Sequence, residues 1–259
     1  MTNTSNAVAT KLLTLNEVLA LVLTIAIAVA LVHLSSSGRT DMGVAIPAPS
    51  AEVVAVLQQA GGAGETAVFA GGCFWGIQAV FQHTQGVLSA VSGYAGGEQA
   101  GANYQLVSGG ATRHAEAVQL SYDPRQVSYA QLLQIYFSVA HDPTQLNRQY
   151  PDVGSQYRSE VFYTDAIQKQ MVERYIAQLN AAMVFPSKIV TQLSPLKAFY
   201  PAEDYHQNYA TRHPDSAYIA QFDRPKIARL KALMPALYRE TPLLVAAHDT
   251  GVKPASPAQ

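Results

Sequence analysis

The sequence has only one cysteine and one tryptophan in 259 residues, and both fall in the same short stretch. A single cysteine excludes an internal disulfide and any zinc site built from several cysteines. Charged residues are also scarce, at 14% against 49% hydrophobic residues, and the formal net charge is −1. This balance gives no electrostatic reason to expect nucleic acid or an anionic surface as a partner. The length allows one sizeable domain or two small ones.

The cysteine, Cys73, lies in the stretch GGCFWG at residues 71–76. The apolar residues before it are typical of a buried strand, and those after it have helical spacing. Two glycines between them allow a tight turn. The pattern predicts a helix that begins near Cys73, where unpaired backbone N–H groups stabilise a thiolate and lower the thiol pKa. We therefore expect a nucleophile, with Phe74 and Trp75 beside it, rather than a cysteine that only packs.

Residues 18–34, VLALVLTIAIAVALVHL, form an apolar run without Asp, Glu, Lys or Arg. Their number is at the lower limit for a membrane-spanning helix. We expect residues 1–34 to be an uncleaved signal anchor, and a cleaved signal peptide is the alternative. Either would place the rest of the chain outside the cytoplasm, on the periplasmic or extracellular face. The protein would be membrane-anchored, or secreted if the signal is cleaved. Residues 35–65, rich in Gly, Pro and Ser, are expected to be a flexible linker.

From residue 66 onward, strand and helix patterns alternate. Short apolar segments, and an alternation of apolar and small residues at 87–94, predict strands at residues 68–70, 87–94, 115–122, 159–163 and 188–192. Helical spacing predicts helices at residues 74–83, 129–140, 166–179 and 226–237. This order indicates a sheet with helices packed on it, in an α+β or α/β arrangement. We expect one catalytic domain at residues 66–220 and a C-terminal extension at residues 221–259.

Several polar residues stand between or at the start of these elements. Glu116 opens an apolar strand, and the alternative is a surface glutamate on an edge strand. Asp142 and Asp152 lie in a long loop of the kind that is often functional, although each could simply cap a turn. The histidines His114 and His206, together with His141, lack the close spacing that a metal site would show.

Seven motifs occur in the order found in one enzyme family: GCFWG (72–76), GYAGG (93–97), Asn103-Tyr104, HAEAV (114–118), HDPTQ (141–145), DVGSQYRS (152–159) and AEDYHQNY (202–209). Over residues 66–209 the chain closely resembles the A-type peptide methionine sulfoxide reductases. The resemblance implies an α+β fold, a two-layer α/β sandwich with a ferredoxin-like core, here preceded by the N-terminal apolar helix. It also implies reduction of the S-epimer of methionine sulfoxide, free or in proteins, and thereby repair of oxidised proteins.

The resemblance also implies roles for individual residues. Cys73 would attack the sulfoxide sulfur, and Glu116 would donate the proton that makes the oxygen a leaving group. A partly buried glutamate can carry that proton near neutrality because burial raises its pKa. The product on the enzyme is a cysteine sulfenic acid. The substrate-binding residues that it implies are Phe74, Trp75, Tyr104, Asp152, Tyr157 and Tyr205.

One departure from the family changes the expected regeneration. Many members carry a second, resolving cysteine near the C-terminal end of the domain, and the comparable stretch here, residues 213–219 (HPDSAYI), has none. The sulfenic acid must then be reduced by an external thiol: thioredoxin, glutaredoxin or glutathione, or a dithiol. We expect no bound cofactor or metal, and a monomer. The expected partners are oxidised methionine-containing proteins, the thiol reductant and the membrane, but not nucleic acid.

Two other function classes could use the same residues. A cysteine hydrolase would pair Cys73 with His114 or His206 as base and would form an acyl-enzyme. A module that only binds methionine-rich peptides would use the aromatic residues and would keep its function in Cys73→Ser. Loss of one oxygen from a sulfoxide substrate separates the reductase from both.

Overall fold

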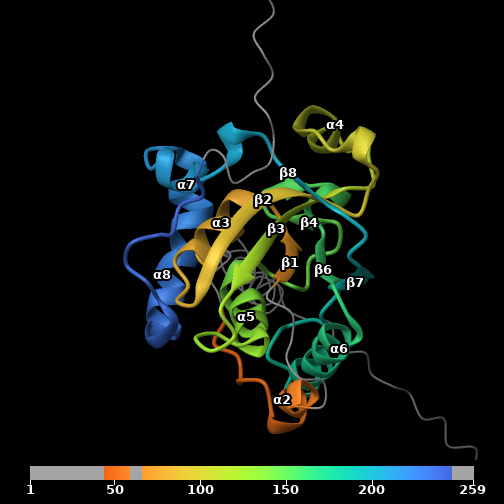
Figure 1. The fold of residues 1–259 in the computed structure, drawn as a ribbon, viewed down its shortest axis with the longest axis vertical. Coiled ribbons are helices and arrows are strands. Elements are labelled where there is room, and N and C mark those ends of the chain that lie inside the picture. The colour runs from red at the N-terminus through yellow and green to blue at the C-terminus, as the bar shows by residue number, and fades with distance from the viewer. Residues whose placement is uncertain (1–43, 59–65, 247–259) are drawn as a thin grey trace, which may run out of the picture. The chain divides into compact units, whose positions relative to one another are not determined.

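A computed structural model describes residues 44–58 and 66–246 of the chain (Figure 1). The apolar run at residues 18–34, and with it the expected N-terminal helix, lies outside the described residues. Within the described ranges, no helix is both long enough and apolar enough to cross a membrane.

Four strands and two connecting helices form the centre of the domain: β1 (Thr66–Gly71), α3 (Phe74–Gln82), β2 (Val87–Ala95), β3 (Ala115–Tyr122), α5 (Tyr129–Ile135) and β6 (Ser159–Tyr163). The strands lie in the order β6-β1-β3-β2, and each is antiparallel to its neighbour. The chain order β-α-β-β-α-β with this sheet order is the ferredoxin-like arrangement. The mixed α and β architecture predicted from the sequence is therefore confirmed.

Two short strands extend the sheet to six. At one edge β7 (Gln192–Pro195) runs parallel to β6, and at the other β8 (Phe199–Pro201) runs antiparallel to β2. The strand predicted at residues 188–192 is wrong, because β7 begins only at Gln192. The preceding backbone bonds elsewhere: the Val190 N–H donates to the carbonyl of Pro143 at 2.9 Å. A small separate hairpin pairs β4 (Arg148–Gln149) with β5 (Asp152–Val153).

The sheet has one large core on the face covered by α3, α5 and α6 (Ala166–Ala181). Successive residues of β1 alternate between its two faces, as a strand requires. Phe69 points into the main core, where its ring stacks on Phe81 and Tyr136. Val68 and Ala70 belong to a smaller cluster on the opposite face. This alternation also places Glu116 of β3 on the helix-covered face, since its neighbours Ala115 and Ala117 belong to the smaller cluster.

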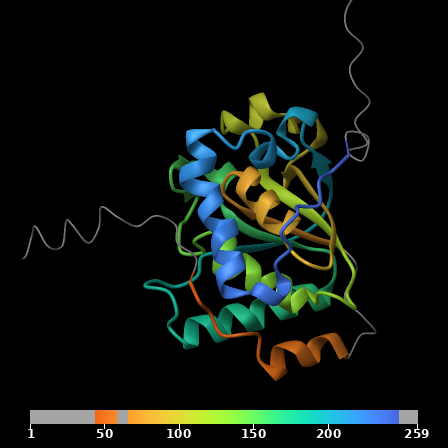
Figure 2. The same cartoon turned by 90° about the vertical axis from the view of Figure 1, so that its left-hand side faces the viewer.

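The remaining helices are short, apart from α8 (Arg224–Leu233). They are α4 (Tyr104–Ser108), α7 (Tyr209–Arg212), the π-helical segments η2 (Tyr136–Ala140) and η5 (Ile219–Asp223), and the 3₁₀ turns η1 (Gln99–Gly101), η3 (Ser155–Tyr157), η4 (Asp204–His206) and η6 (Pro235–Leu237). The helix predicted at residues 129–140 is thus α5 continued by η2. Figure 2 shows α8 running beside α3, the helix that begins after Cys73.

Part of the predicted linker belongs to the folded domain. The helix α2 (Ala51–Gln58) packs on α6, with Val53 and Val56 buried. Before it, the Val44 N–H donates to the carbonyl of Ser138 at 2.7 Å, and the Tyr175 hydroxyl donates to the carbonyl of Pro47 at 2.7 Å. Residues 44–58 therefore differ from the flexible linker predicted over residues 35–65, because Val53 and Val56 are buried where α2 packs on α6.

The expected C-terminal extension is likewise packed as far as the structure describes it. Asn208 and Val245 exchange two hydrogen bonds, of 2.9 and 3.0 Å. The Leu243 N–H donates to the carbonyl of Gln82 at the end of α3 at 3.0 Å. Residues 221–246 therefore form part of the same domain rather than an appendage to it.

Candidate active site

The turn before Cys73 requires both of its glycines. Gly72 has φ +96°, a conformation that residues with a side chain rarely adopt, and a Cβ there would meet the Gln149 side chain at 2.6 Å. A Cβ on Gly71 would meet the ring of His141 at 2.7 Å. The loop after η2 thus packs directly on this backbone. In this backbone Cys73 is the N-cap residue of α3.

Cys73 is buried, with 9% of its surface exposed. Burial raises the pKa of its thiol, and the charges of Glu116, Asp223 and Asp152 raise it further. The Trp75 N–H, in the first turn of α3, donates to the sulfur and acts in the opposite direction. The sequence predicts a lowered thiol pKa at the helix N-terminus, and that prediction is wrong. The lowering of the thiol pKa by one helix N–H group is outweighed by the raising effect of desolvation and of three carboxyl groups from distant segments.

Glu116 lies beside the nucleophile on an interior strand. β3 is flanked by β1 and β2, so the alternative of an edge-strand surface residue does not apply. The side chain is 1% exposed, and its Oε2 accepts the Phe74 N–H at 3.1 Å. Burial raises the pKa of Glu116 from 4.5 to about 8, although the Phe74 N–H partly offsets this rise. Glu116 therefore holds a proton at pH 7, next to the first turn of the helix that carries Cys73.

Aromatic rings form one wall beside Cys73. The indole of Trp75 stacks on Tyr209 with ring centroids 3.7 Å apart and planes within 9°. Its Nε1–H donates to Nδ1 of His206 at 3.1 Å, and Phe74 also packs against this imidazole. Burial lowers the pKa of His206 to about 4. His206 is thus neutral, with its proton on Nε2, and serves as a flat part of the wall.

Glu203 fixes Tyr104 from the C-terminal side of the chain. Its carboxylate accepts the Tyr104 N–H at 2.9 Å and the Tyr94 hydroxyl at 2.8 Å. The Tyr104 ring lies 4.3 Å from that of His206, centroid to centroid. Burial raises the pKa of Tyr104, and the charges of Glu116 and Cys73 raise it further. The phenol therefore remains protonated, close to both groups.

Two more predicted residues come from the loop between η2 and β6. Tyr157 lies in η3, and its pKa is raised by burial and then by the charges of Glu116, Asp152 and Cys73. Asp152 in β5 accepts the hydroxyl of Tyr218 at 2.5 Å. Burial raises the pKa of Asp152, while this hydrogen bond acts in the opposite direction. The structure thus brings the two loop residues to the same place as Cys73 and Glu116.

Tyr205 is the most exposed of the predicted site residues. Its side chain is 57% exposed, and its ring contacts His206 at 4.2 Å between centroids. His206 and Tyr209, from the same AEDYHQNY motif, contact Trp75 instead. The motif could have pointed to these two residues. Tyr218, which meets Trp75 edge-on with ring centroids 5.9 Å apart, lies outside the seven motifs, in the stretch comparable to that of the resolving cysteine.

His114 and His141, the two other histidines considered from the sequence, make structural hydrogen bonds. His114 accepts the Gly97 N–H at 3.2 Å through Nδ1, and its Nε2 lies 2.9 Å from the carbonyl of Glu98. His141 bonds the carbonyl of Tyr136 and the hydroxyl of Ser159. In the described ranges, no three His, Cys, Asp or Glu side chains are grouped so as to hold a metal ion.

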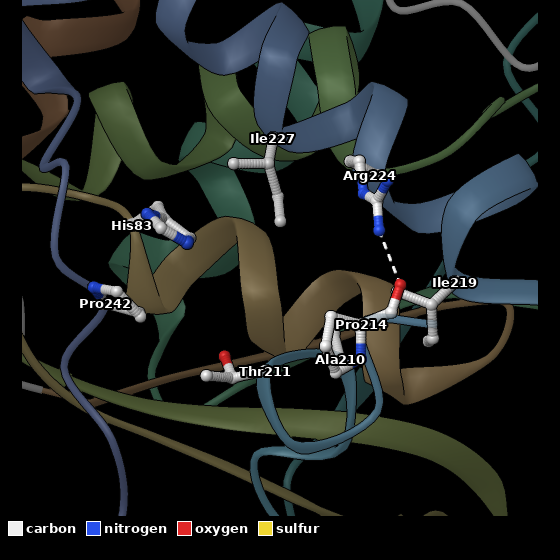
Figure 3. A pocket seen from close by; sticks show the side chains of 8 residues that line it. All are labelled: His83, Ala210, Thr211, Pro214, Ile219, Arg224, Ile227 and Pro242. Atoms are coloured by element: carbon white, nitrogen blue, oxygen red, sulfur yellow. Dashed lines mark hydrogen bonds between the residues drawn. The ribbon is translucent and has the colours of Figure 1, made fainter. Parts of the chain in front are cut away.

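A separate pocket of about 280 Å³ lies between the end of α3, α7 and α8 (Figure 3). It is lined by His83, Ala210, Thr211, Pro214, Ile219, Arg224, Ile227 and Pro242. Arg224 donates to the carbonyl of Pro214 across one side of it. None of the residues placed around Cys73 lines this pocket, so it is distinct from the site described above. Ile219, which falls in the stretch comparable to that of the resolving cysteine, forms part of its wall.

Comparisons with known proteins agree on one family. The family model described as "Peptide methionine sulfoxide reductase" matches residues 65–235. The "Peptide methionine sulfoxide reductase MsrA 2" of Mesorhizobium japonicum is 57% identical over 181 residues, 70% of this chain and 93% of that protein. Its namesake in Synechocystis is 50% identical over 186 residues, 72% and 86% of the two chains. The solved methionine sulfoxide reductase A of Corynebacterium diphtheriae is 35% identical, with a TM-score of 0.51 over 65% of this chain and 83% of that one.

Proposed function

This chain belongs to the A-type peptide methionine sulfoxide reductases, and we propose that it reduces the S-epimer of methionine sulfoxide with one cysteine. The enzyme reduces methionine sulfoxide and so repairs oxidised proteins. The observation that carries the proposed mechanism is the pairing of a buried, protonated Glu116 with Cys73 at the first turn of α3. Cys73 is the nucleophile, and Glu116 is the acid.

In the first step the Cys73 sulfur attacks the sulfoxide sulfur while Glu116 delivers its proton to the sulfoxide oxygen. The oxygen then leaves the substrate sulfur and remains on the cysteine. A thiol and a sulfoxide thus give a sulfenic acid and a thioether, so that cysteine is oxidised and methionine is formed. The proton that the Cys73 thiol loses passes to Glu116 and restores its protonated form, so the step is balanced.

The surrounding side chains suit a sulfoxide. The half-buried Trp75 presents apolar ring surface to the methyl group, and the fully buried Phe74 packs behind it. Aromatic side chains of this kind bind apolar groups well. Tyr104 and Tyr157 keep their hydroxyl protons because their pKa values are raised, so both can donate to the sulfoxide oxygen. Asp152 completes the polar side of the pocket, and Tyr205 is exposed where the rest of a peptide substrate would continue.

Regeneration of the enzyme requires an external thiol, because the sequence has no second cysteine. One thiol attacks the sulfenic acid to form a mixed disulfide and releases water. A second thiol attacks that disulfide, which restores Cys73 and leaves the oxidised reductant as a disulfide. Thioredoxin, glutaredoxin, glutathione or a small dithiol could each supply these two electrons.

The direct test is mass spectrometry of N-acetyl-methionine sulfoxide incubated with the full chain and a small dithiol. We expect loss of one oxygen from half of a racemic sulfoxide, and chiral separation should find the R-epimer left. Cys73→Ser is the matched control and should leave both epimers intact. Equal consumption by Cys73→Ser would overturn the proposed nucleophile.

For localisation we propose that residues 18–34 anchor the protein in a membrane, with the catalytic domain outside the cytoplasm. The support is the length of this run and its lack of charged residues. The full-length protein should then resist carbonate extraction, and protease added from the non-cytoplasmic side should degrade the domain. A soluble product that begins near Leu31 would show instead that the segment is a cleaved signal.

A further inference from the structure

Two opposite charges are buried together where η5 ends and α8 begins. Asp223 is 0% exposed and Lys226 is 4% exposed, and the Lys226 Nζ lies 3.5 Å from the Asp223 Oδ1. The two residues are three positions apart, so they project from the same side of the helix. We call Asp223 and Lys226 the α8 charge pair. Burying such a pair costs desolvation energy that its attraction often does not recover, so stability alone is a weak reason for it.

The α8 charge pair lies against the turn that carries the nucleophile. A Cβ on Gly76, the third residue of α3, would lie 2.8 Å from the Asp223 Cγ and 3.0 Å from the Lys226 Nζ. Glycine at this position therefore lets the pair approach the helix backbone one turn away from Cys73. α8 runs beside α3 (Figure 2), and the close approach at Gly76 places both charges against the first turn of the helix whose N-cap is Cys73.

We propose that the α8 charge pair is a positioning pair that sets the ionisation of Cys73, with Lys226 compensating the negative charge of Asp223. This role builds on the proposed nucleophile and lies outside the seven family motifs. The titratable groups that act on the sulfur are Glu116 from β3, Asp152 from β5, Asp223, and the phenols Tyr104, Tyr157 and Tyr218. Lys226 acts on two groups of the same surroundings, Asp152 and His141.

Asp223 is one of the carboxyl groups whose negative charge opposes ionisation of the nearby Cys73 thiol. Glu116 is protonated near pH 7, which leaves Asp152 and Asp223 as the other carboxyl groups that act on the sulfur. The positive charge of Lys226 also lowers the pKa of Asp152, because it favours the ionised form of that carboxyl. A cation held here offsets charges that would otherwise oppose formation of the thiolate.

The test measures the rate of Cys73 alkylation by iodoacetamide as a function of pH in the full chain. Asp223→Asn removes the negative member, so the midpoint should fall by about one pH unit, which gives about tenfold faster alkylation below the midpoint. Lys226→Met removes the positive member and should shift the midpoint upward by a similar amount. The double variant should lie near the wild type. Lys169→Met, which removes an exposed cation from a surface ion pair, is the matched control and should change nothing.

A pair that only anchors α8 on α3 would lower the melting temperature without moving the alkylation midpoint. Unchanged midpoints in folded Asp223→Asn or Lys226→Met protein would therefore overturn the proposal. If a single variant is unfolded by circular dichroism, the other decides through the sign of its shift. If both are unfolded, Asp223→Glu, which keeps the charge but moves it, must shift the midpoint. Alkylation needs no turnover, so failure of the α8 charge pair is distinguishable from failure of the proposed reductase mechanism.

Discussion

Replacing Glu116 with glutamine should reduce turnover while making the protein more stable at high pH. Glutamine keeps the size of the side chain, and its carbonyl oxygen can still accept the Phe74 N–H, which now lies 3.1 Å from Oε2. It cannot donate a proton as a carboxylic acid does. We therefore expect turnover of N-acetyl-methionine sulfoxide to fall about a hundredfold, within the usual range for a general acid. This loss corresponds to about 2.7 kcal/mol of transition-state stabilisation.

The change in stability follows from the pKa of the buried carboxyl. Burial raises it from 4.5 to about 8, so the folded protein binds this proton more tightly than the unfolded chain does. Stability from this group is therefore fully present below pH 4.5 and is lost as the pH rises to about 8. At about 1.4 kcal/mol per pKa unit, the loss above pH 8 amounts to at most about 5 kcal/mol. Glutamine does not ionise, so Glu116→Gln should not lose stability in this way as the pH rises.

Urea unfolding of wild type and Glu116→Gln at pH 5 and pH 9 measures this difference, because other titrating groups cancel in the comparison. The variant should gain several kcal/mol over the wild type between the two pH values. In the wild type, turnover should also decline as the pH rises through 8, and the variant should lack that decline. A stability difference that is the same at both pH values, together with near-wild-type turnover, would refute both the buried acid and its role.

Three further variants test neighbouring contacts. Gly76→Ala places a methyl group where the α8 charge pair now packs and should lower the free energy of unfolding by about 2 kcal/mol, measured in urea. Tyr218→Phe removes the hydrogen bond to Asp152 and should lower the free energy of unfolding by about 1–3 kcal/mol, because the partly buried carboxyl is left without that donor. Little change in the melting temperature would contradict this. Trp75→Phe loses the bond to His206 and should raise KM for N-acetyl-methionine sulfoxide about fivefold with a smaller effect on kcat, as steady-state kinetics would show.

The interior of the sheet could be predicted from local pattern. Residues 115–122 and 159–163 were predicted as strands, and β3 and β6 have these bounds, because apolar residues recur along both segments and turn signals flank them. The helix after Cys73 was equally readable from its spacing. At the edge of the sheet the pattern failed. β7 consists of Gln, Leu, Ser and Pro, and nothing in that composition distinguishes it from a loop.

The electrostatics of the site could not be read from the sequence, because they depend on segments far apart in the chain. The thiol pKa is governed by burial and by carboxyl groups at positions 116, 152 and 223, which only the fold brings together. Lys226 stands in the stretch RPKIARLK, where a lysine reads as an ordinary surface residue. The packing of α2 on α6 also depends on a partner more than a hundred residues away. By contrast, Cys73 could be singled out from its local pattern, whereas Glu116 was assigned its role by the resemblance of the HAEAV motif to the family.

The central claim is that a single cysteine reduces methionine sulfoxide and has no internal partner to resolve it. It is tested most directly by mixing the full chain with excess methionine sulfoxide in the absence of thiol and counting the methionine formed. We expect one methionine per protein, with Cys73 as a sulfenic acid that a dimedone probe labels. Two methionines per protein would show that a second group supplies electrons, and they would contradict the one-cysteine mechanism.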